Sequence, residues 1–418
     1  MMRVGFLGAS HLGQVYSAAT ALRGMQVVVV DTDAELITEL QLAPSVAEPG
    51  LTEAWRQTEL LRTCTTNLES LLQCQIVFIT KDVPTSDSGK SDLGVIEDLM
   101  SQLAHVLDGS GVPVVLMAQV QPGTTRRFAG QYDNLAYQVE TLVFGDALHR
   151  ALNPERHIIG IVRRESDLHL CHREWLEHFP AEHFVMALES AELAKIAINL
   201  FLAASVSTTN SLAELARAVG ANWHDIVPTL RADRRIGSHA YLSPGLGLAG
   251  GNIERDLASF LQLAVQHDVH ATVIESYVRS SEYHRGWVLR QLAAEGHIGS
   301  GVIAVLGLAY KPDTASTKNS ASLELLQHLG GQSVRVHDPQ AQSNSLASSV
   351  TRCSTWTDAV TEADAVVVMT AWSNYAEIDV TTLARLMRGR LVLDPFGVLD
   401  ADAMSANGLN HRVLTRGG

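Results

Sequence analysis

The stretch that decides the fold is MRVGFLGASHLGQVYSAATALRGMQVVVVDTD, residues Met2–Asp33. An apolar strand from Arg3 to Leu7 runs into a glycine turn, a helical stretch follows, and a second apolar strand over Val27–Val30 ends at Asp31. An acid about 20 residues after such a turn completes the fingerprint of a β-α-β dinucleotide-binding unit. We therefore expect the unit to bind a dinucleotide, with the acid bonding the ribose hydroxyls and favouring NAD over NADP.

The glycine turn departs from the fingerprint at one position. GASHLG carries Gly8 and Gly13 at the outer positions of GxGxxG, but Ser10 replaces the middle glycine. That glycine normally lets the backbone approach the pyrophosphate closely. With serine there, the phosphates must sit slightly differently or bond the hydroxyl. A tight turn without a ligand is the alternative, and the surrounding strands, helix and acid argue for binding.

Alternating strands and helices continue beyond this unit. CQIVFIT (Cys74–Thr80) and VPVVLMA (Val112–Ala118) are strand-like runs separated by helical pattern, which indicates a parallel sheet. From about Ser190 to Ala264 the pattern is long, helical and apolar on one face, and Gly220 supplies a helix stop.

A second α/β unit begins near Gly301. GVIAVLGLAYKP is a strand with a glycine turn, QSVRVHDP is a strand ending at Asp338, and the runs DAVVVMTAW and RLVLDPFG follow. We therefore predict an α/β chain in which two Rossmann-like, doubly wound domains are joined by a central all-helical segment. The expected domains are residues 1–188, which bind NAD, 189–297, which are helical and dimerise, and 298–418, which bind a nucleotide sugar.

Composition excludes several other classes of protein. The chain has 418 residues, a net charge of −14 and 46% hydrophobic residues. This charge argues against nucleic acid as a partner, and no apolar run predicts a membrane span. The scattered cysteines form no CxxC pair, which favours a reducing cytoplasm. CHREWLEHF groups Cys171, His172 and His178, but its spacing fits an amphipathic helix better than zinc, so no metal is expected.

Several longer motifs carry a family resemblance along the whole chain. EPGL follows the second strand, VPTSDSGKSDL covers Val83–Leu93, and ALNPERHIIG ends the first domain. SAELAKIAINLFLA, RADRRIG, GLAYKPDT and TAW follow in order. Together they resemble the UDP-glucose/GDP-mannose dehydrogenase family. The resemblance implies NAD as cofactor, a nucleotide-sugar substrate, a homodimer formed through the central helices, and oxidation of the sugar's C6 alcohol to a carboxylate through a cysteine thiohemiacetal.

The resemblance also assigns roles to single residues. Lys195 and Asn199 are four residues apart and so share one face of a helix. By resemblance, Lys195 handles the alcohol proton and the oxyanion, Asn199 orients groups beside it, and Asp256 holds a water with the lysine. Glu140 assists water in hydrolysis. Asn252 is also expected in the catalytic site, where its side chain could hydrogen-bond an alcohol, an aldehyde or a hydrate. A salt bridge facing the helix is the structural alternative for the lysine and the aspartate.

The matched motifs also predict the cofactor-binding and the substrate-binding residues. The expected cofactor-binding residues come from the glycine turn, the strand ends and the loops that face them: Gly8, Ser10, His11, Leu12, Gly13, Asp31, Val83, Thr85, Gln119, Arg255 and Lys318. The expected substrate-binding residues are Arg235, which by resemblance reaches the neighbouring subunit's sugar site, and Tyr241, Leu242, Gly247 and Lys311.

The departures from the family pattern fall at positions expected in the catalytic and cofactor-binding sites. GLGLAGGNIERD (Gly245–Asp256) aligns without gaps to the family's loop and places Asn252 where the cysteine belongs. A carboxamide nitrogen is not a nucleophile, because its lone pair is delocalised into the carbonyl, so no covalent adduct can form there. Other replacements relative to the family are Arg255 for lysine, Gln119 for threonine, Phe144 for glutamate, Lys318 for arginine, Ser316 for aspartate, and Phe396-Gly397 for Arg-Asn.

Three functions remain open on these residues. The first is a two-electron oxidation that stops at the carbonyl, which needs only NAD, a positioned alcohol and a proton acceptor. The second is a full oxidation to the acid through a hydrated aldehyde, which is itself an alcohol. The third is a non-catalytic nucleotide-binding homologue. The retention of Lys195, Asn199, Asp256 and Asp31 favours an enzyme, and the two-electron version leads.

Overall fold

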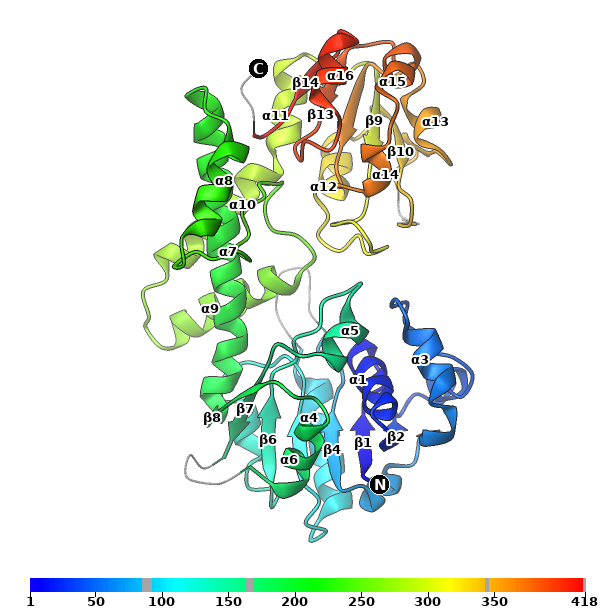
Figure 1. Cartoon of the computed structure of the whole chain (residues 1–418), viewed down its shortest axis with the longest axis vertical. Helices are drawn as coiled ribbons and strands as arrows, with labels where there is room; N and C mark the ends of the chain where they lie inside the picture. The colour runs from blue at the N-terminus through cyan, green and yellow to red at the C-terminus, as the bar shows by residue number, and fades with distance from the viewer. Residues whose placement is uncertain (85–91, 163–167, 343–345, 416–418) are drawn as a thin grey trace. The chain divides into compact units, whose positions relative to one another are not determined.

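The computed structural model describes residues 1–84, 92–162, 168–342 and 346–415 (Figure 1). By their internal contacts they form two compact units, Met1–Ile198 and Asn199–Gly418. Each unit contains one parallel-rich sheet with helices around it. The expected α/β class with a helical segment between two sheets is confirmed, while the division into three domains stays a prediction. Thr85 lies outside the described residues.

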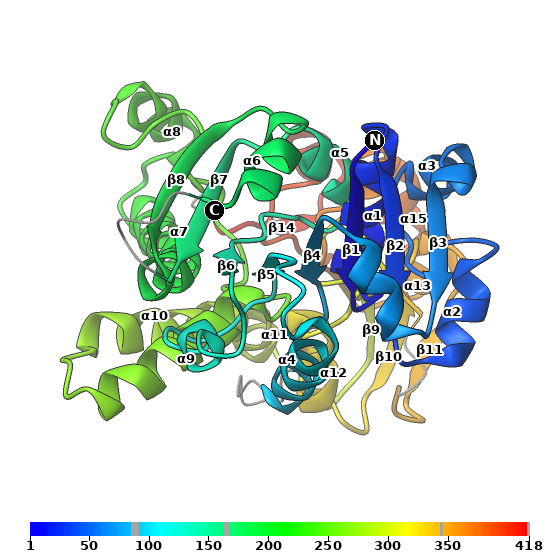
Figure 2. The same cartoon turned by 90° about the horizontal axis from the view of Figure 1, so that it is seen from below.

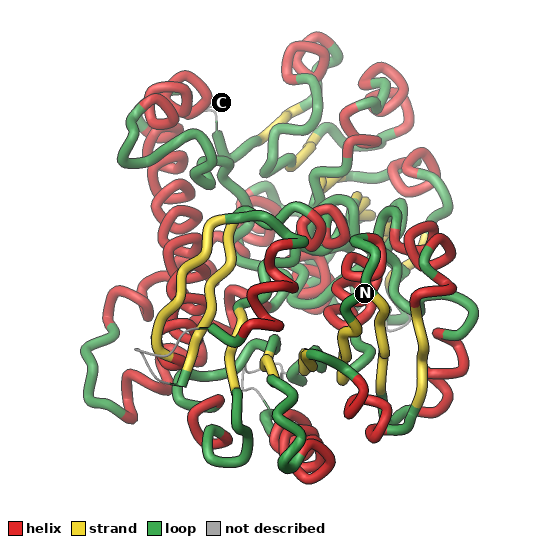
Figure 3. Tube along the Cα trace, turned by 60° about the horizontal axis from the view of Figure 1, so that its bottom comes forward, coloured by secondary structure: helices red, strands yellow, loops and turns green. Residues whose placement is uncertain are grey.

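The sheet of the first unit has eight strands in the order β3-β2-β1-β4-β5-β6-β7-β8. All neighbours are parallel except β6 and β7, which pair antiparallel. Figure 3 shows its strands side by side in yellow. Their bounds are β1 Arg3–Leu7, β2 Gln26–Val30, β3 Arg62–Thr65, β4 Ile76–Ile79, β5 Val114–Leu116, β6 Leu135–Gln138, β7 Arg156–Ile161 and β8 Glu182–Ala187.

Alternate side chains of each strand point to opposite faces of the sheet. The central strands are apolar at consecutive positions, so both faces are apolar and helices cover both. Phe6 and Phe78 pack with residues of α1, α3, α5 and α6, whereas Leu7 and Ile79 pack with residues of α4 and the start of α7. Figure 2 shows these helices and the strands of the sheet as ribbons. The helices are α1 His11–Leu22, α2 Ala34–Leu40, α3 Leu51–Gln57, α4 Gly94–Leu107, α5 Ala147–Leu152 and α6 Leu170–Glu177, with short 3-10 turns at Glu59–Leu61, Leu68–Gln73 and Thr125–Phe128.

A long helix, α7, spans Leu188–Ala218 and ends before Gly220, whose φ of 76° is the left-handed geometry expected of a helix stop. By length and composition alone α7 could cross a membrane, although 44% of its most apolar window is buried inside the protein. One such helix is weak evidence for a membrane span, so the sequence expectation of no spanning segment is not overturned. The buried core helix of a soluble protein passes the same test.

The second unit opens with helices and ends with a sheet. The helices are α8 Trp223–Ala232, α9 Asn252–Gln266, α10 Thr272–Arg285, α11 Trp287–Ala294, α12 Ala321–His328, α13 Trp356–Val360, α14 Ser373–Ala376, α15 Val380–Leu386 and α16 Ala401–Ala406. The strands are β9 Val302–Leu306, β10 Ser333–His337, β11 Val350–Arg352, β12 Ala365–Val368, β13 Leu391–Leu393 and β14 Asn410–Arg412.

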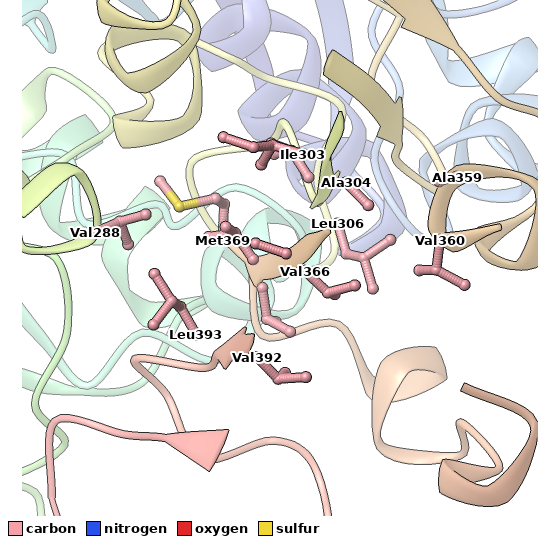
Figure 4. Packing of buried hydrophobic residues seen from close by; sticks show 14 of the residues in the cluster. Val288, Ile303, Ala304, Leu306, Ala359, Val360, Val366, Met369, Val392 and Leu393 are labelled. Atoms are coloured by element: carbon pink, nitrogen blue, oxygen red, sulfur yellow. The ribbon is translucent and has the colours of Figure 1, made fainter. Parts of the chain in front are cut away.

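This second sheet is parallel throughout, in the order β11-β10-β9-β12-β13-β14. Its central strands are almost continuously apolar, as strands buried on both faces must be. Figure 4 shows both faces of this sheet: Leu393 of β13 lies toward Val288 of α11, whereas Leu306 of β9 and Val366 of β12 lie toward Val360 of α13. Such a sheet places its ligand-binding loops at the carboxyl ends of the strands.

Candidate active site

The glycine turn after β1 is shaped by close backbone contacts. Gly8 has a φ of 101°, and a β-carbon on it would lie 2.7 Å from the backbone nitrogen of Lys81. A β-carbon on Gly13 would lie 2.0 Å from the carbonyl oxygen of Gly8. Both outer glycines are therefore required so that β1, α1 and the end of β4 can approach one another.

Ser10, which replaces the middle glycine, is engaged with the protein itself. Its hydroxyl donates to the carbonyl of Thr80 at 2.8 Å and accepts from the backbone N–H of Asp82 at 3.1 Å. Ser10 is the N-cap residue of α1, yet its side chain makes no capping hydrogen bond. The first N–H groups of α1 thus have no side-chain cap from Ser10, which suits the binding of a phosphate at this helix end.

Asp31 lies at the end of β2 and is held from three directions. Its carboxylate accepts from the backbone N–H groups of Ala9 at 2.7 Å and Asp33 at 3.1 Å. The Lys81 ammonium lies 2.8 Å from Oδ2 and 3.2 Å from Oδ1. Burial alone would raise the pKa of Asp31, but the hydrogen bonds from Lys81 and the backbone outweigh it, so the pKa is lowered and the group is ionised.

His11 begins α1 and is positioned by the EPGL motif. Its Nε2 lies 2.8 Å from Oε1 of Glu48, whose other oxygen accepts from the backbone N–H of Gly145 at 3.0 Å. The His11 ring also contacts Phe144, with centroids 4.4 Å apart. Leu12 is buried beneath the turn. Glu48 and Lys81 were absent from the residues expected in this site, although EPGL was noted as a motif.

The other expected cofactor residues of this unit follow strand ends. Val83 is buried in the segment after β4, and Gln119 is partly buried three residues after β5. Because neighbouring strands β2, β1, β4, β5 and β6 are parallel, the residues that follow them lie along the carboxyl edge of one sheet. This is the edge at which such sheets bind dinucleotides.

Glu140 follows β6 at the same edge and pairs with the catalytic lysine expected from the sequence. Lys195 Nζ lies 2.7 Å from Glu140 Oε1 and donates to the Glu140 carbonyl at 3.0 Å. The second carboxylate oxygen accepts from the backbone N–H of Leu142 at 3.0 Å. Both side chains are mostly buried. The structure therefore joins Lys195 to Glu140 as a fixed, charged pair, a contact that the sequence did not predict.

In the second unit, Asn199 and Asp256 meet directly. Asn199 Nδ2 donates to Asp256 Oδ2 at 2.5 Å, and both side chains are buried. Arg255 Nε lies 3.9 Å from Asp256 Oδ1, too far for a hydrogen bond. Within the described part of the chain this buried guanidinium nitrogen has no hydrogen-bond partner, which fits a residue that contacts a ligand.

The glycine-rich loop before α9 is packed tightly against its own unit. A β-carbon on Gly247 would lie 2.6 Å from the Ser281 carbonyl, and one on Gly250 would lie 2.5 Å from the Tyr310 ring. Both glycines have positive φ angles, 77° and 90°. The Arg285 guanidinium donates to the Leu248 carbonyl at 2.7 Å. Close contacts within the protein and the positive φ angles are thus enough to require glycine at both positions, whether or not a ligand also approaches the loop.

Asn252 is the first residue of α9, and its side chain is exposed. The preceding Gly251 donates its N–H to Glu254 at 3.1 Å. Arg285 and Asn319 hold the same carboxylate at 2.6 and 2.9 Å. The helix start is therefore fixed by residues from α10 and the segment before α12, while the carboxamide of Asn252 faces solvent.

The remaining expected residues of this unit have varied surroundings. Lys318 is exposed, and its side-chain carbons lie beside Gly251, while the Lys311 ammonium lies 5.9 Å from the centroid of the Tyr310 ring. Arg235 is exposed and pairs with Asp233 at 2.6 Å. The carbonyl of Tyr241 accepts from the Thr209 hydroxyl at 2.9 Å, and the side chain of Tyr241 is half exposed. The carbonyl of Leu242 accepts from the Trp223 indole at 2.9 Å, and Leu242 is buried.

Comparison with known proteins shows the family of the chain. Three models of one family match in order: the NAD binding domain over residues 2–175, the central domain over 189–283 and the UDP binding domain over 304–401. The chain belongs to the UDP-glucose/GDP-mannose dehydrogenase family. It is therefore an NAD-dependent nucleotide-sugar dehydrogenase in type, and NAD is its cofactor.

Individual members of the family are similar over nearly the whole chain. The UDP-glucose 6-dehydrogenase TuaD of Bacillus subtilis is 27% identical and covers 100% of this chain and 94% of its own. A UDP-glucose 6-dehydrogenase of Pseudomonas aeruginosa is 30% identical over 94% of this chain and 93% of its own. The structure of a UDP-glucose dehydrogenase from Pyrobaculum islandicum has a TM-score of 0.87 at 26% identity, covering 100% and 98%.

Proposed function

We propose that the enzyme oxidises one alcohol of a nucleotide sugar, the C6 hydroxyl of the sugar, in a single two-electron step. The product is released as an aldehyde, and no thiohemiacetal forms. The observation that carries this proposal is Asn252 at the start of α9, in the place of the family's cysteine. Its exposed carboxamide can hydrogen-bond an alcohol or an aldehyde, but it cannot attack one.

The four cysteines of the chain do not offer a substitute nucleophile. None stands in the glycine-rich loop, and burial raises the pKa of each thiol. A thiol with a raised pKa carries little thiolate near neutral pH, and the thiolate is the nucleophilic form. The thiols are Cys64, Cys74, Cys171 and Cys353, and the pKa of Cys74 is raised to about 11.

The retained polar residues support the first oxidation. NAD supplies the hydride acceptor when it is bound. The alcohol loses a hydride and a proton, and its oxygen passes through a state of partial negative charge. We assign the stabilisation of that charge to the Lys195 ammonium and the acceptance of the proton to the Asp256 carboxylate. Glu140 holds the lysine in position, and Asn199 orients the aspartate.

The substrate is expected to be UDP-linked, because the model that matches the last part of the chain is a UDP binding domain. We place the contacts to the nucleotide sugar on the loop that contains Leu242 and Gly247 and on Lys311. Tyr241 and Arg235 are exposed at the surface of the second unit. An exposed arginine of this kind is suited to reach the sugar site of a neighbouring subunit.

A homodimer is part of the proposal. Phe201, Leu212 and Leu215 are exposed apolar residues of α7, and their spacing places them on one side of the helix. An apolar stripe of this length on a surface helix is typical of a protein interface. We also assign the enzyme to the cytoplasm, where free thiols such as the cysteines of this chain are stable.

Full oxidation to the acid is a second candidate. A hydrated aldehyde is an alcohol and can give up a second hydride without any covalent adduct. The exposed amide of Asn252, which both donates and accepts hydrogen bonds, suits a hydrate with two hydroxyls. This route would use the same lysine and aspartate twice, and it would consume two molecules of NAD for each sugar.

The experiment is to incubate the protein with NAD and a panel of UDP- and GDP-linked sugars, measuring NADH and product mass together, with Lys195→Met as the inactive control. One NADH per product that is two hydrogens lighter supports the two-electron oxidation. A carboxylate with two NADH overturns it in favour of the hydrate route. NAD binding without NADH from any sugar would overturn both and favour the non-catalytic homologue.

A further inference from the structure

The carboxylate expected to bind the ribose is already saturated by the protein. A carboxylate has about four lone-pair positions. Those of Asp31 face the N–H groups of Ala9 and Asp33 and the ammonium of Lys81, which reaches both oxygens. The carboxylate is only 2% exposed, whereas the Lys81 side chain is 28% exposed. A ribose hydroxyl arriving at this edge of the sheet therefore meets the lysine first.

The lysine also changes the charge that a ligand encounters. A lone aspartate at this position repels a 2′-phosphate, and this repulsion is the ordinary basis for preferring NAD over NADP. Here the carboxylate and the ammonium form a neutral pair at 2.8 Å. The group nearest to solvent in that pair is an ammonium with three N–H donors, which can bind phosphate oxygens as a point charge.

The second sheet shows that the fold does not need a lysine at this position. Asp338, at the end of β10, occupies the place in that sheet that Asp31 occupies in the first. It accepts from the N–H groups of Leu308 and Ala309 at 2.6 and 3.0 Å and from the Trp372 indole at 3.2 Å. Among the residues that the structure describes, the donors to this buried acid after the second strand are thus neutral.

The residue that corresponds to Lys81 in the second sheet is Thr370. A β-carbon on Gly307 would lie 2.7 Å from the backbone nitrogen of Thr370, just as one on Gly8 would lie 2.7 Å from that of Lys81. The two glycines have φ angles of 103° and 101°. The close approach of the glycine turn to the backbone after the neighbouring strand is therefore common to both sheets. The ammonium group of Lys81 is present only in the first sheet, which binds the dinucleotide.

We propose that Lys81 forms a binding site for a 2′-phosphate at the ribose end of the cofactor site, so that the protein binds NADP as well as NAD. The backbone N–H groups of Ala9 and Asp33 hold Asp31 in place. Lys81 turns from the carboxylate toward the phosphate when a 2′-phosphorylated ligand arrives. The sequence pattern, which predicts NAD alone from Asp31, does not include this lysine, because it lies 50 residues further along the chain.

The test measures binding by calorimetry on the whole chain, with ADP-ribose and 2′-phospho-ADP-ribose as probes. Neither probe carries nicotinamide, so the result is independent of hydride transfer and of the proposed sugar oxidation. For the natural protein we expect dissociation constants within about tenfold of each other, because the ion pair is electrically neutral. A 2′-phospho probe that binds more than roughly a thousandfold more weakly than ADP-ribose would overturn the proposal.

Variants separate a direct contact from a structural role. Lys81→Met keeps the chain length, and it should weaken the 2′-phospho probe at least about tenfold relative to ADP-ribose, since Asp31 is then unpaired. Lys81→Arg should restore the natural ratio of the two dissociation constants. Recovery in this variant would show that the loss in Lys81→Met comes from the missing charge and not from a folding defect. The control Arg56→Met removes a positive charge from the surface of α3 and should change neither probe. An unchanged ratio in Lys81→Met would contradict the assignment.

Discussion

The amide nitrogen of Asn199 donates to the carboxylate of Asp256 across 2.5 Å, and both side chains are buried. The aspartate is the group to which we assign the acceptance of the proton, and the asparagine is a neutral hydrogen-bond donor to it. A neutral donor stabilises the ionised carboxylate without adding charge to the site. This contact therefore fixes the position of the carboxylate to which we assign the acceptance of the proton.

Asn199→Asp tests that relationship. Two carboxylates at such a short distance cannot both be ionised, so they would share a proton and the apparent pKa of the pair would rise. We expect the acidic limb of the kcat/KM profile to move to higher pH by roughly one unit or more. Asn199→Ala is the matched control, because it lowers activity without adding a second acid. An unshifted profile in Asn199→Asp would argue against Asp256 as the proton acceptor.

The ion pair between Lys195 and Glu140 leads to a second prediction. Lys195→Met removes the charge assigned to the developing oxyanion, and we expect kcat to fall by about 10²- to 10⁴-fold with little change in KM for the sugar. Glu140→Gln keeps a hydrogen-bond acceptor 2.7 Å from the ammonium, so its loss should be smaller. Steady-state kinetics of the two variants provide the comparison. A larger loss in Glu140→Gln than in Lys195→Met would instead assign the chemistry to the glutamate.

Much of the fold was predictable because local patterns and topology agree. The strand from Arg3 to Leu7 is buried from its second residue onward, and Gly220 adopts the left-handed geometry that ends α7. The strands β6, β7 and β8 were not predicted. β8 is mostly exposed along its length, and β7 pairs antiparallel with β6, so neither continues the alternation on which the prediction was based.

The sequence motifs predicted single residues of the candidate site but not the contacts between them. The sequence places Asp31 after a strand, but its contact with Lys81 depends on the strand order β2-β1-β4, which brings two distant strand ends together. The same holds for Glu48, which contacts His11 from 37 residues away. Residue types and spacing identify members of such a site, and the topology of the sheet decides their partners.

A third prediction concerns stability at acid pH. His172 is buried on α6, where desolvation first, and then repulsion from His157, His169 and His183, lowers its pKa to about 3. Because this folded-state pKa lies below the usual value of 6.5, the folded protein resists protonation. The stabilisation is complete above about pH 6.5 and is lost as the pH falls toward 3, which amounts to about 2 kcal/mol at pH 5.

Urea unfolding at pH 7 and at pH 5 measures this loss. His172→Gln removes the titrating group while retaining a side chain that can bond Gln138, the residue that lies 2.7 Å from His172 Nε2. The variant should be less stable than the natural protein at pH 7 but should lose less stability on acidification. His157, whose pKa is also lowered by burial, contributes equally to both proteins. Equal losses in the two proteins would show that His172 does not titrate on unfolding.

The last prediction returns a nucleophile to the loop. In Asn252→Cys the new thiol would occupy the first position of α9, where the helix N-terminus lowers the pKa of a thiol. The thiolate could trap the aldehyde as a thiohemiacetal, which can give up a second hydride, and water would then release the acid. We expect two NADH and a carboxylate from each nucleotide sugar, where the natural protein yields one NADH and an aldehyde.

Asn252→Ser is the matched control for this gain of function, because a hydroxyl of similar size is not activated at neutral pH without a base. It should keep the one-NADH stoichiometry. Iodoacetamide should return Asn252→Cys to little or no acid formation while leaving Asn252→Ser unaffected. If Asn252→Cys still stops at the aldehyde although its thiol reacts with iodoacetamide, then the loop does not hold the sugar in reach of α9. The block to full oxidation would then lie in a replaced residue beside the loop, such as Phe396, whose ring would lie 3.3 Å from a β-carbon on Gly245.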